Sequence, residues 1–469
     1  MSGTANDLAR WQFATTSVYH FFFVPVTIGL AFLVAILQTA WYRTDKPEYK
    51  RMTRFFGTLL LINVAIGVVT GLVQEFEFGM NWSTYSRYVG GVFGAPLAME
   101  GLAAFFLEST FLGLWLFGWD RLPRRVHLAC IWAVSIGSML SAMFILIANS
   151  WMQHPVGYEI KNGHAVLNNV WALFVNPTFV WGYAHVILAS LITGCLVMLA
   201  VSAWYLRKGA HLESFRRTAK VALLVLIPTI VIQLSVGNQL GLIENNYQPM
   251  KIAAAEAQWN SCKPCSFSAA QIGGGANDKT PKEIIPIPHL LSVLATGTWG
   301  GGVTGLNQLQ AQDVAKYGPG NYVPDVFIQY WSMRVMAYLG SLVLLLAAWG
   351  GWLMHRGRLE RSRVFLTLSV WAVVTPFLMN TAGWLLTESG RQPWIVQGLQ
   401  KTVKASSPSV SATEIAISLA VFVGAYIALA AADLYLMLRY SRRGLSEADA
   451  EAESAQREPP PGAFPALTY

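Results

Sequence analysis

Nine apolar segments, each long enough to cross a lipid bilayer, constrain what this 469-residue chain can become. A spanning helix needs about 20 mostly apolar residues. The predicted spans, with soft edges, are 16–41, 55–75, 94–118, 127–150, 177–206, 219–243, 326–354, 364–387 and 413–438. Only 12% of the residues are charged, whereas soluble domains carry about 25%. We therefore predict an all-α polytopic membrane protein with about nine transmembrane helices.

The distribution of Lys and Arg predicts how these helices are oriented. The connections after the first, third, fifth, seventh and ninth spans hold 20 basic residues, against 11 on the other side. Cytoplasmic loops carry the excess of Lys and Arg, so we expect the N-terminus outside and the C-terminus in the cytoplasm. The net charge of +8 is spread between apolar runs, which argues against a nucleic-acid partner because no basic surface is concentrated on one domain.

The spans divide the chain into four regions. We expect helices 1–6 in residues 1–243, an extracytoplasmic loop at 244–325, helices 7–9 in 326–438 and a disordered cytoplasmic tail at 439–469. A loop of this length is more often functional than idle. It begins with a helix-like stretch from Met250 to Trp259 and then becomes rich in Gly and Pro.

Two short motifs in the loop carry little weight. Gly300, Gly302 and Gly305 match a dinucleotide-binding spacing, but no strand precedes them. Cys262 and Cys265 have the spacing of a metal ligand pair, yet the loop holds no second pair. A disulfide on the oxidising side of the membrane explains these cysteines better than zinc does.

Ionisable side chains inside the spans are the strongest functional signal, because they are costly in a bilayer. They sit mostly near the outer ends of their helices. The group consists of His20, Glu100, Glu108, His185, Arg334 and Glu388, with Met336 two residues beyond Arg334.

His185 and Met336 have the side chains of a low-spin haem ligand pair, since His and Met both bind haem iron. A single histidine within a span is more often a hydrogen-bonded packing residue, and a lone methionine is nearly always a core residue. The presence of several candidates at the same depth strengthens the ligand interpretation modestly.

Glu100 and Glu108 are eight residues apart on one predicted helix, so their side chains share a face at a spacing of about 12 Å along the axis. Ser109 and Ser141 place hydroxyl groups at similar depths. Such carboxyls can hold or pass protons, although pairing within the bundle would explain them as well.

The segment from Gly383 to Trp394 is the densest polar and aromatic cluster at any span end. Interfacial Trp residues are common in membrane proteins. A carboxylate, Glu388, and a guanidinium, Arg391, packed between two indoles are not explained by that preference.

The sequence resembles the large subunit of cytochrome bd quinol oxidase, in the form with a short quinol-binding loop. The likeness covers all nine spans. The matching stretches are Gly94–Gly101, Phe106–Phe111, Gly118–Asp120, Gln248–Ala257 and Gly383–Trp394.

The resemblance implies a role for each of these side chains. His185 and Met336 correspond to the axial ligands of a low-spin haem b, with Arg334 beside them. His20 and Glu388 correspond to the ligands of two high-spin haems, one haem b and one haem d, with Glu100 close by. Trp384 lies between the haems, and Arg391 pairs with propionates. Glu108, Ser109 and Ser141 belong to a proton route, and Lys251 and Glu256 belong to the quinol site.

The resemblance also implies an activity and partners. The expected enzyme oxidises membrane quinol at the outer face and reduces O2 to water with cytoplasmic protons, which separates charge without a pump. Its cofactors are two haem b and one haem d. We expect a second large membrane subunit, small single-span subunits and a location in the bacterial cytoplasmic membrane.

Two other interpretations remain open from the residues alone. A secondary transporter also carries Glu, His and Arg within its spans, but its sites lie near the bilayer midplane. A haem-free structural subunit of a respiratory complex would leave Glu388 and Arg391 without a purpose.

Overall fold

A computed structural model describes residues 3–445 and confirms nine helices long enough to span a membrane within that range. Seven of them are single α-helices from the first residue to the last, and six of these seven precede the last span. These are α1 (Gly3–Thr44), α2 (Pro47–Met80), α5 (Arg124–Gln153), α7 (Pro177–Lys208), α8 (Leu212–Tyr247) and α12 (Val326–His355). The last span, α15 (Ala412–Arg442), is also continuous.

Two spans are interrupted by a change of helical type. The third span joins α3 (Ser83–Met99) to α4 (Phe106–Phe117) through the π-helical segment η1 (Glu100–Phe105). The eighth joins α13 (Arg363–Trp371) to α14 (Thr375–Gly390) through the 3₁₀ turn η3 (Ala372–Val374). π turns occur often at functional sites, and η1 begins at one of the predicted functional carboxylates.

Most helices are longer than the sequence predicts, because polar residues extend them beyond their apolar runs. The first span begins at Gly3 instead of residue 16, so His20 lies further along its helix than expected. The last helix continues to Arg442, so the first residues of the expected tail are helical. The rest of the predicted tail, from residue 446 onward, lies outside the described residues.

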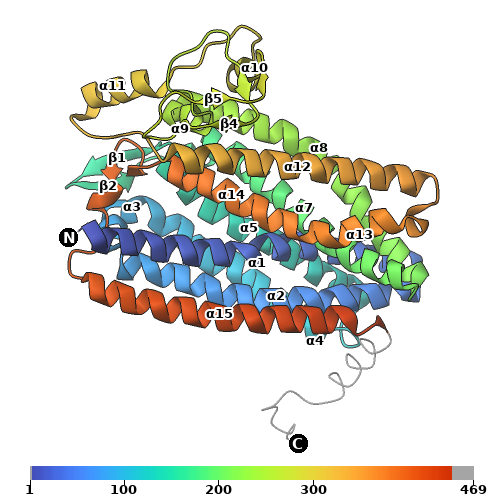
Figure 1. The fold of residues 1–469 in the computed structure, drawn as a ribbon. Helices are drawn as coiled ribbons and strands as arrows, with labels where there is room; N and C mark the ends of the chain where they lie inside the picture. The colour runs from blue at the N-terminus through green and yellow to red at the C-terminus, as the bar shows by residue number, and fades with distance from the viewer. Residues whose placement is uncertain (1–2, 446–469) are drawn as a thin grey trace, which may run out of the picture.

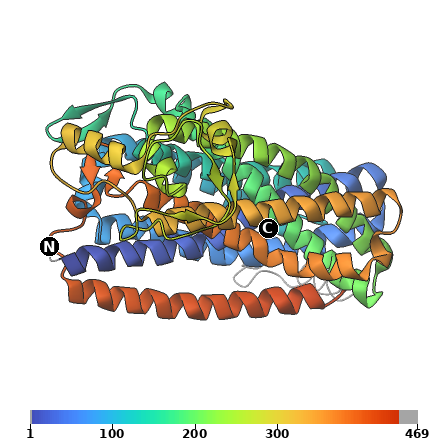
Figure 2. The same cartoon turned by 45° about the horizontal axis from the view of Figure 1, so that its top comes forward.

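The helices form one elongated bundle with their axes nearly parallel (Figure 1). Residues 248–325 lie against the end of the bundle that also carries the N-terminus, and we call this end the loop end (Figures 1 and 2). The helices pack closely in the opposite half. There, α1 and α7 meet at Gly29 and Gly194, where an added Cβ on Gly29 would lie 2.7 Å from the Gly194 Cα. Small residues allow this close approach of helices in membranes.

The loop is a folded layer with little regular sheet. It contains α9 (Pro249–Ala255), α10 (Leu290–Thr296) and α11 (Leu306–Tyr317). Two short antiparallel pairs connect them, β3 (Phe267–Ser268) with β6 (Pro286–Ile287) and β4 (Gln271–Ile272) with β5 (Lys282–Glu283). The helix at the start is shorter than the expected stretch to Trp259, and the structure contains the Cys262–Cys265 disulfide favoured above.

Smaller elements at the loop end close the connections between spans. These are the hairpin of β1 (Tyr158–Lys161) and β2 (His164–Leu167), α6 (Val170–Phe174), the pair β7 (Trp394–Val396) and β8 (Gln400–Lys401), and η4 (Thr402–Lys404). At the opposite end, η2 (Leu359–Arg361) joins α12 to α13.

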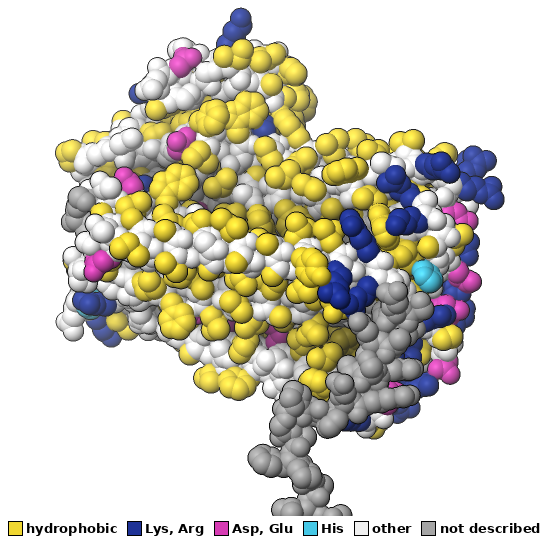
Figure 3. All heavy atoms as spheres, turned by 60° about the horizontal axis from the view of Figure 1, so that its bottom comes forward, with side chains coloured by type: hydrophobic (Ala, Val, Ile, Leu, Met, Phe, Trp, Pro, Cys, Tyr) yellow, Lys and Arg dark blue, Asp and Glu magenta, His cyan; other side chains and the backbone are white. Residues whose placement is uncertain are grey.

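The surface has the charge pattern of a membrane protein. On the face that carries α15, hydrophobic side chains cover the length of the bundle, and most of the visible Lys and Arg side chains gather at the end opposite the N-terminus (Figure 3). This asymmetry is the one that the sequence counts predict.

Candidate functional site

The loop-end half of the bundle is incompletely filled by side chains. Helix α7 packs against α8, α1, α13, α5 and α14, yet nine consecutive residues, 181–189, remain partly exposed. The following residues, from 192 to 200, are all buried. A central helix that is buried in one half and accessible in the other indicates space around its first half, since protein interiors normally leave few voids.

His185 lies in this accessible part of α7. The amide Nε2 of Gln233 on α8 is 3.2 Å from both ring nitrogens of His185. Gly237, one turn further along α8, also faces the ring, and an added Cβ there would lie 3.4 Å from it. Met336 on α12 likewise faces a glycine, because a Cβ on Gly383 would lie 3.5 Å from its sulfur.

His20 has similar surroundings between α1 and α2. Its Nδ1 lies 3.0 Å from the hydroxyl of Thr70, and a Cβ added to Gly71 would lie 3.1 Å from the ring. Trp384 on α14 packs edge to face against Phe21, the residue next to His20, with ring centroids 5.0 Å apart. The structure thus brings Trp384 against the residue that follows the predicted ligand His20 on α1.

Glu388 ends a chain of side-chain hydrogen bonds that the sequence did not reveal. Asn149 donates to its carboxylate at 2.8 Å, and Gln153 donates to Asn149 at 2.9 Å. Lys251 donates to Gln153 at 2.6 Å. The two amides lie one turn apart on α5, and this spacing is the only sequence signal that could have indicated them.

Arg391 forms an ion pair with Glu388 and is almost fully buried. Its Nε and Nη1 have no hydrogen-bond partner among the described residues. A buried guanidinium with free donors is suited to an anionic group from outside the chain, such as a propionate.

These residues fit iron-bound macrocycles. His, Met and Glu are suitable iron ligands. His20, His185 and Met336 each lie beside a glycine of a neighbouring helix, which leaves room next to the side chain. Arg391 offers donors without a partner among the described residues. The described residues contain no cluster of three or more His, Cys, Asp or Glu that could bind a bare metal ion.

The predicted proton-route residues are partly connected. Ser141 donates to Glu100 at 2.8 Å, while the other Glu100 oxygen has no partner among the described residues. In a regular α-helix, residues eight apart differ by about 80° in direction. The wider π turn of η1 lies between Glu100 and Glu108 and reduces this offset. Ser109 instead donates back to the Phe105 carbonyl at 2.8 Å.

A third carboxyl, Glu75 on α2, faces Glu100 closely enough to interact electrostatically. In the sequence, Glu75 lies at the end of the predicted span 55–75, where an interfacial carboxylate is ordinary, so nothing there marks it as functional.

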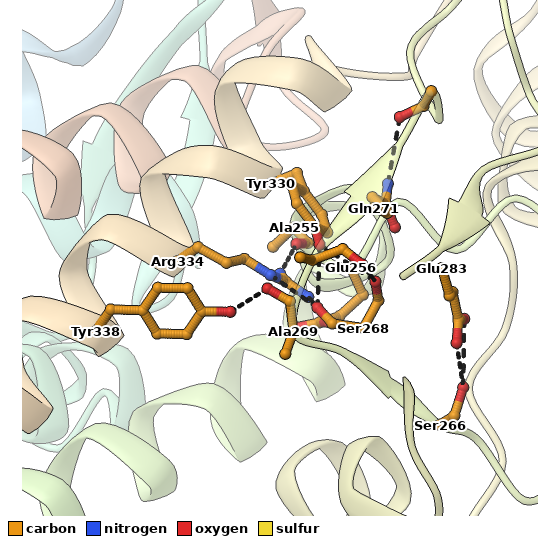
Figure 4. Close-up of polar contacts among 12 residues, drawn as sticks. Ala255, Glu256, Ser266, Ser268, Ala269, Gln271, Glu283, Tyr330, Arg334 and Tyr338 are labelled. Carbon is orange, nitrogen blue, oxygen red and sulfur yellow. Dashed lines mark hydrogen bonds and ion pairs between the residues drawn. The ribbon is translucent and has the colours of Figure 1, made fainter. Parts of the chain in front are cut away.

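Arg334 holds the loop onto the bundle. Its guanidinium donates to the Glu256 carboxylate at 2.6 Å, to the Ala255 carbonyl at 2.5 Å and to the Ser268 carbonyl at 2.7 Å (Figure 4). Arg334 and Glu256 are both buried, and the guanidinium also lies 3.8 Å from the centre of the Tyr330 ring. The resemblance places Arg334 beside iron ligands, and in the structure its polar atoms are directed at the loop.

Lys251 and Glu256 are both buried at the base of the loop. Lys251 forms an ion pair with Glu244 at 3.1 Å. Burial lowers the pKa of Lys251, and Glu244 opposes this shift. Burial raises the pKa of Glu256, and Arg334 opposes it. A small hollow beside Lys251 is also lined by Gln248, Tyr322, Arg391 and Trp394.

Comparisons with known proteins identify relatives of this chain. Residues 8–445 match the family model described as cytochrome bd terminal oxidase subunit I. The chain is 44% identical to the cytochrome bd ubiquinol oxidase subunit 1 of Bacillus subtilis (93% of both chains). It is 36% identical to the cytochrome bd-II ubiquinol oxidase subunit 1 of Escherichia coli (96% of this chain, 99% of the relative).

A solved structure has the same fold. It is that of the bd oxidase from Geobacillus thermodenitrificans, with a TM-score of 0.85 and 30% identity, over 95% of this chain and 100% of that one. The family match over nearly the whole sequence, together with this structural likeness, shows that the chain belongs to the cytochrome bd terminal oxidase subunit I family.

Proposed function

We propose that this chain is the subunit of a respiratory quinol oxidase that oxidises quinol beside its loop and reduces O2 inside the loop-end half of the bundle. Family membership supports a haem-containing terminal quinol oxidase. The accessible half of α7 is the observation that carries the proposal. It holds His185, and α7 packs against α1 and α14, the helices that carry His20, Trp384 and Glu388.

In this proposal, His185 and Met336 hold a low-spin haem b, and His20 and Glu388 hold one high-spin haem b and one haem d. When bound, the haems carry electrons and bind O2. Gln233 orients the His185 ring, and Thr70 orients His20. Arg391 neutralises propionates with the donors that remain free beside Glu388.

The quinol headgroup binds beside Lys251 and Glu256 at the base of the loop. Quinol oxidation releases two protons. Lys251 is held in place by its ion pair with Glu244, and Glu256 is held by its ion pair with Arg334. Arg334 is a positioning residue in this site, because it fixes Glu256 and two carbonyls of the loop at once.

Protons for water formation reach the oxygen site through Glu108, Ser109, Ser141 and Glu100. The bond from Ser141 to Glu100 supports the last part of this route. With the N-terminus outside and the C-terminus cytoplasmic, quinol protons leave on one side and oxygen protons enter from the other. Charge separation then needs no pump.

The proposed organisation follows from these roles: helices 1–6 in residues 1–243, a quinol-binding loop at 244–325 and helices 7–9 in 326–438. Family membership implies a second subunit in the oxidase, and we also propose small single-span subunits and the bacterial cytoplasmic membrane as the location.

A reduced-minus-oxidised absorption spectrum of the purified oxidase, with a haem count, tests the proposal. We expect haem b bands, a long-wavelength band from haem d, about three haems per chain and oxygen uptake driven by quinol. A colourless but correctly assembled protein would refute the haem assignments and favour a transporter.

A further inference from the structure

A line of polar side chains runs through the apolar bundle between α1, α2 and α15. These three helices lie side by side (Figure 1), and each contacts the other two. We call the contact region the α15 seam. It contains Gln12, Thr16, Ser17 and Tyr19 on α1, Gln74 and Glu77 on α2, and Ser418, Tyr426 and Asp433 on α15.

Glu77 is the centre of the seam. It is only 1% exposed and accepts a hydrogen bond from Thr16 at 3.1 Å. It forms no ion pair among the described residues. A charged carboxylate without a cation is very costly in such surroundings, so the arrangement favours a neutral carboxylic acid.

Several polar atoms of the seam have no hydrogen-bond partner within the described chain. They are Gln12 Nε2, Tyr19 Oη, Gln74 Nε2, Glu77 Oε1, Tyr426 Oη and Asp433 Oδ1. These atoms belong to three neighbouring pairs, Gln12 with Glu77, Gln74 with Tyr426, and Tyr19 with Asp433, whose members lie close together without a well-formed direct hydrogen bond. Buried polar groups in a membrane must be satisfied by protein or by trapped water. Three such pairs along one contact region are therefore suited to bridging by bound water.

The seam also reaches one of the predicted iron ligands. Ser17 donates to Gln74 at 2.8 Å, which leaves the Gln74 amide nitrogen facing the seam. Ser17 lies one turn from His20 on α1, and Gln74 lies one turn from Thr70, the residue that contacts His20. Gln74 thus connects the surroundings of His20 to Glu77.

We propose that the α15 seam is a water-filled proton store for oxygen reduction, in which Glu77 holds the proton. It is separate from the route through Glu108 and Glu100, which lie on α4 and η1. Glu77 releases a proton through water and Gln74 when the site near His20 consumes protons. It recovers a proton through water beside Tyr19, Tyr426 and Asp433, the end of the seam further from the loop. This inference rests on the proposed role of His20.

Infrared difference spectra of the complete purified oxidase, reduced minus oxidised, test the store. The haem content of the parent protein tests the proposed function independently. We expect a carbonyl-stretch band of a protonated carboxylic acid that shifts in D2O, is lost in Glu77→Gln and persists in Glu213→Gln. Glu213 is a matched control because it is exposed at the opposite end.

A second variant and a second measurement keep the test decisive if Glu77→Gln fails to assemble. Thr16→Val keeps the carboxyl but removes its donor, so the same band should shift without disappearing. A high-resolution map should show water within hydrogen-bond distance of Gln12 Nε2, Gln74 Nε2 and Glu77 Oε1. An unchanged band in both variants, or a dry seam in the map, would overturn the proposal even in an active, haem-loaded enzyme.

Discussion

Replacing Arg334 with Met should loosen the loop without unfolding the bundle. The guanidinium is the main polar connection between α12 and the base of the loop, with hydrogen bonds to Ala255, Glu256 and Ser268. Removing one partner of a buried ion pair costs about 3–5 kcal/mol. Since 1.4 kcal/mol corresponds to a factor of ten, local opening of the loop should become about 100- to 4,000-fold more frequent.

Hydrogen exchange of the purified oxidase measures this opening directly. The informative amides are those of Ala257 and Gln258, which close the end of α9 by bonding to the Ala254 and Ala253 carbonyls. They should lose protection in Arg334→Met, while amides in α7 keep theirs. Lys282→Met is the matched control, because Lys282 is an exposed cation of the same loop that forms no ion pair within the described chain.

A double variant separates the charge from the contacts. Combining Arg334→Met with Glu256→Leu removes both members of the pair, so no buried carboxylate is left uncompensated, and part of the protection should return. If the single variant exchanges like the Lys282→Met control, Arg334 does not hold the loop, and our explanation of the buried pair is wrong.

Three further predictions concern the proposed haem and proton sites. Met336→Leu should abolish the low-spin band of the reduced spectrum while the protein stays inserted, and Met333→Leu on the same helix should keep it; an unchanged band in Met336→Leu would exclude this ligand. Asn149→Leu should lower the high-spin haem content, because Glu388 loses the donor at 2.8 Å, whereas Asn149→Gln should restore part of it; equal haem content in both variants would show that Asn149 does not position Glu388. Ser141→Ala removes the donor to Glu100, a hydrogen bond worth about 1.5–3 kcal/mol if the carboxyl is charged, so quinol-driven oxygen uptake should slow by about tenfold or more at unchanged haem content. The control Ser138→Ala only loses a hydrogen bond within its own helix and should keep the parent rate. Equal rates in the two variants would place Ser141 outside the proton route.

The sequence determined the class of fold and most of the candidate ligands. In a bilayer, the backbone N–H and C=O groups of an apolar run of this length form their hydrogen bonds within a helix, so all nine spans could be located without coordinates. Charged residues within those runs are rare for the same energetic reason. His20, Glu100, His185 and Glu388 therefore stood out, and the resemblance gave them roles.

Helix ends and helical irregularities depended on contacts that a hydropathy pattern does not contain. The start of α1 at Gly3 is fixed by packing of polar residues such as Asn6, which donates to the Thr402 carbonyl almost 400 positions away. The π turn at Glu100 has no distinct composition either, because its residues, Gly101 included, are all common in transmembrane helices.

Only the tertiary structure decided which polar groups meet. Gln153 and Asn149 read as ordinary amides in the sequence, but the fold sets them between Lys251 and Glu388. Glu77 looks like an interfacial residue until α15, more than 330 positions later, packs beside it. Hydropathy is a property of consecutive residues, so the sequence shows it directly. A hydrogen bond joins atoms about 3 Å apart in space, and the positions of two residues in the sequence do not reveal whether they form one.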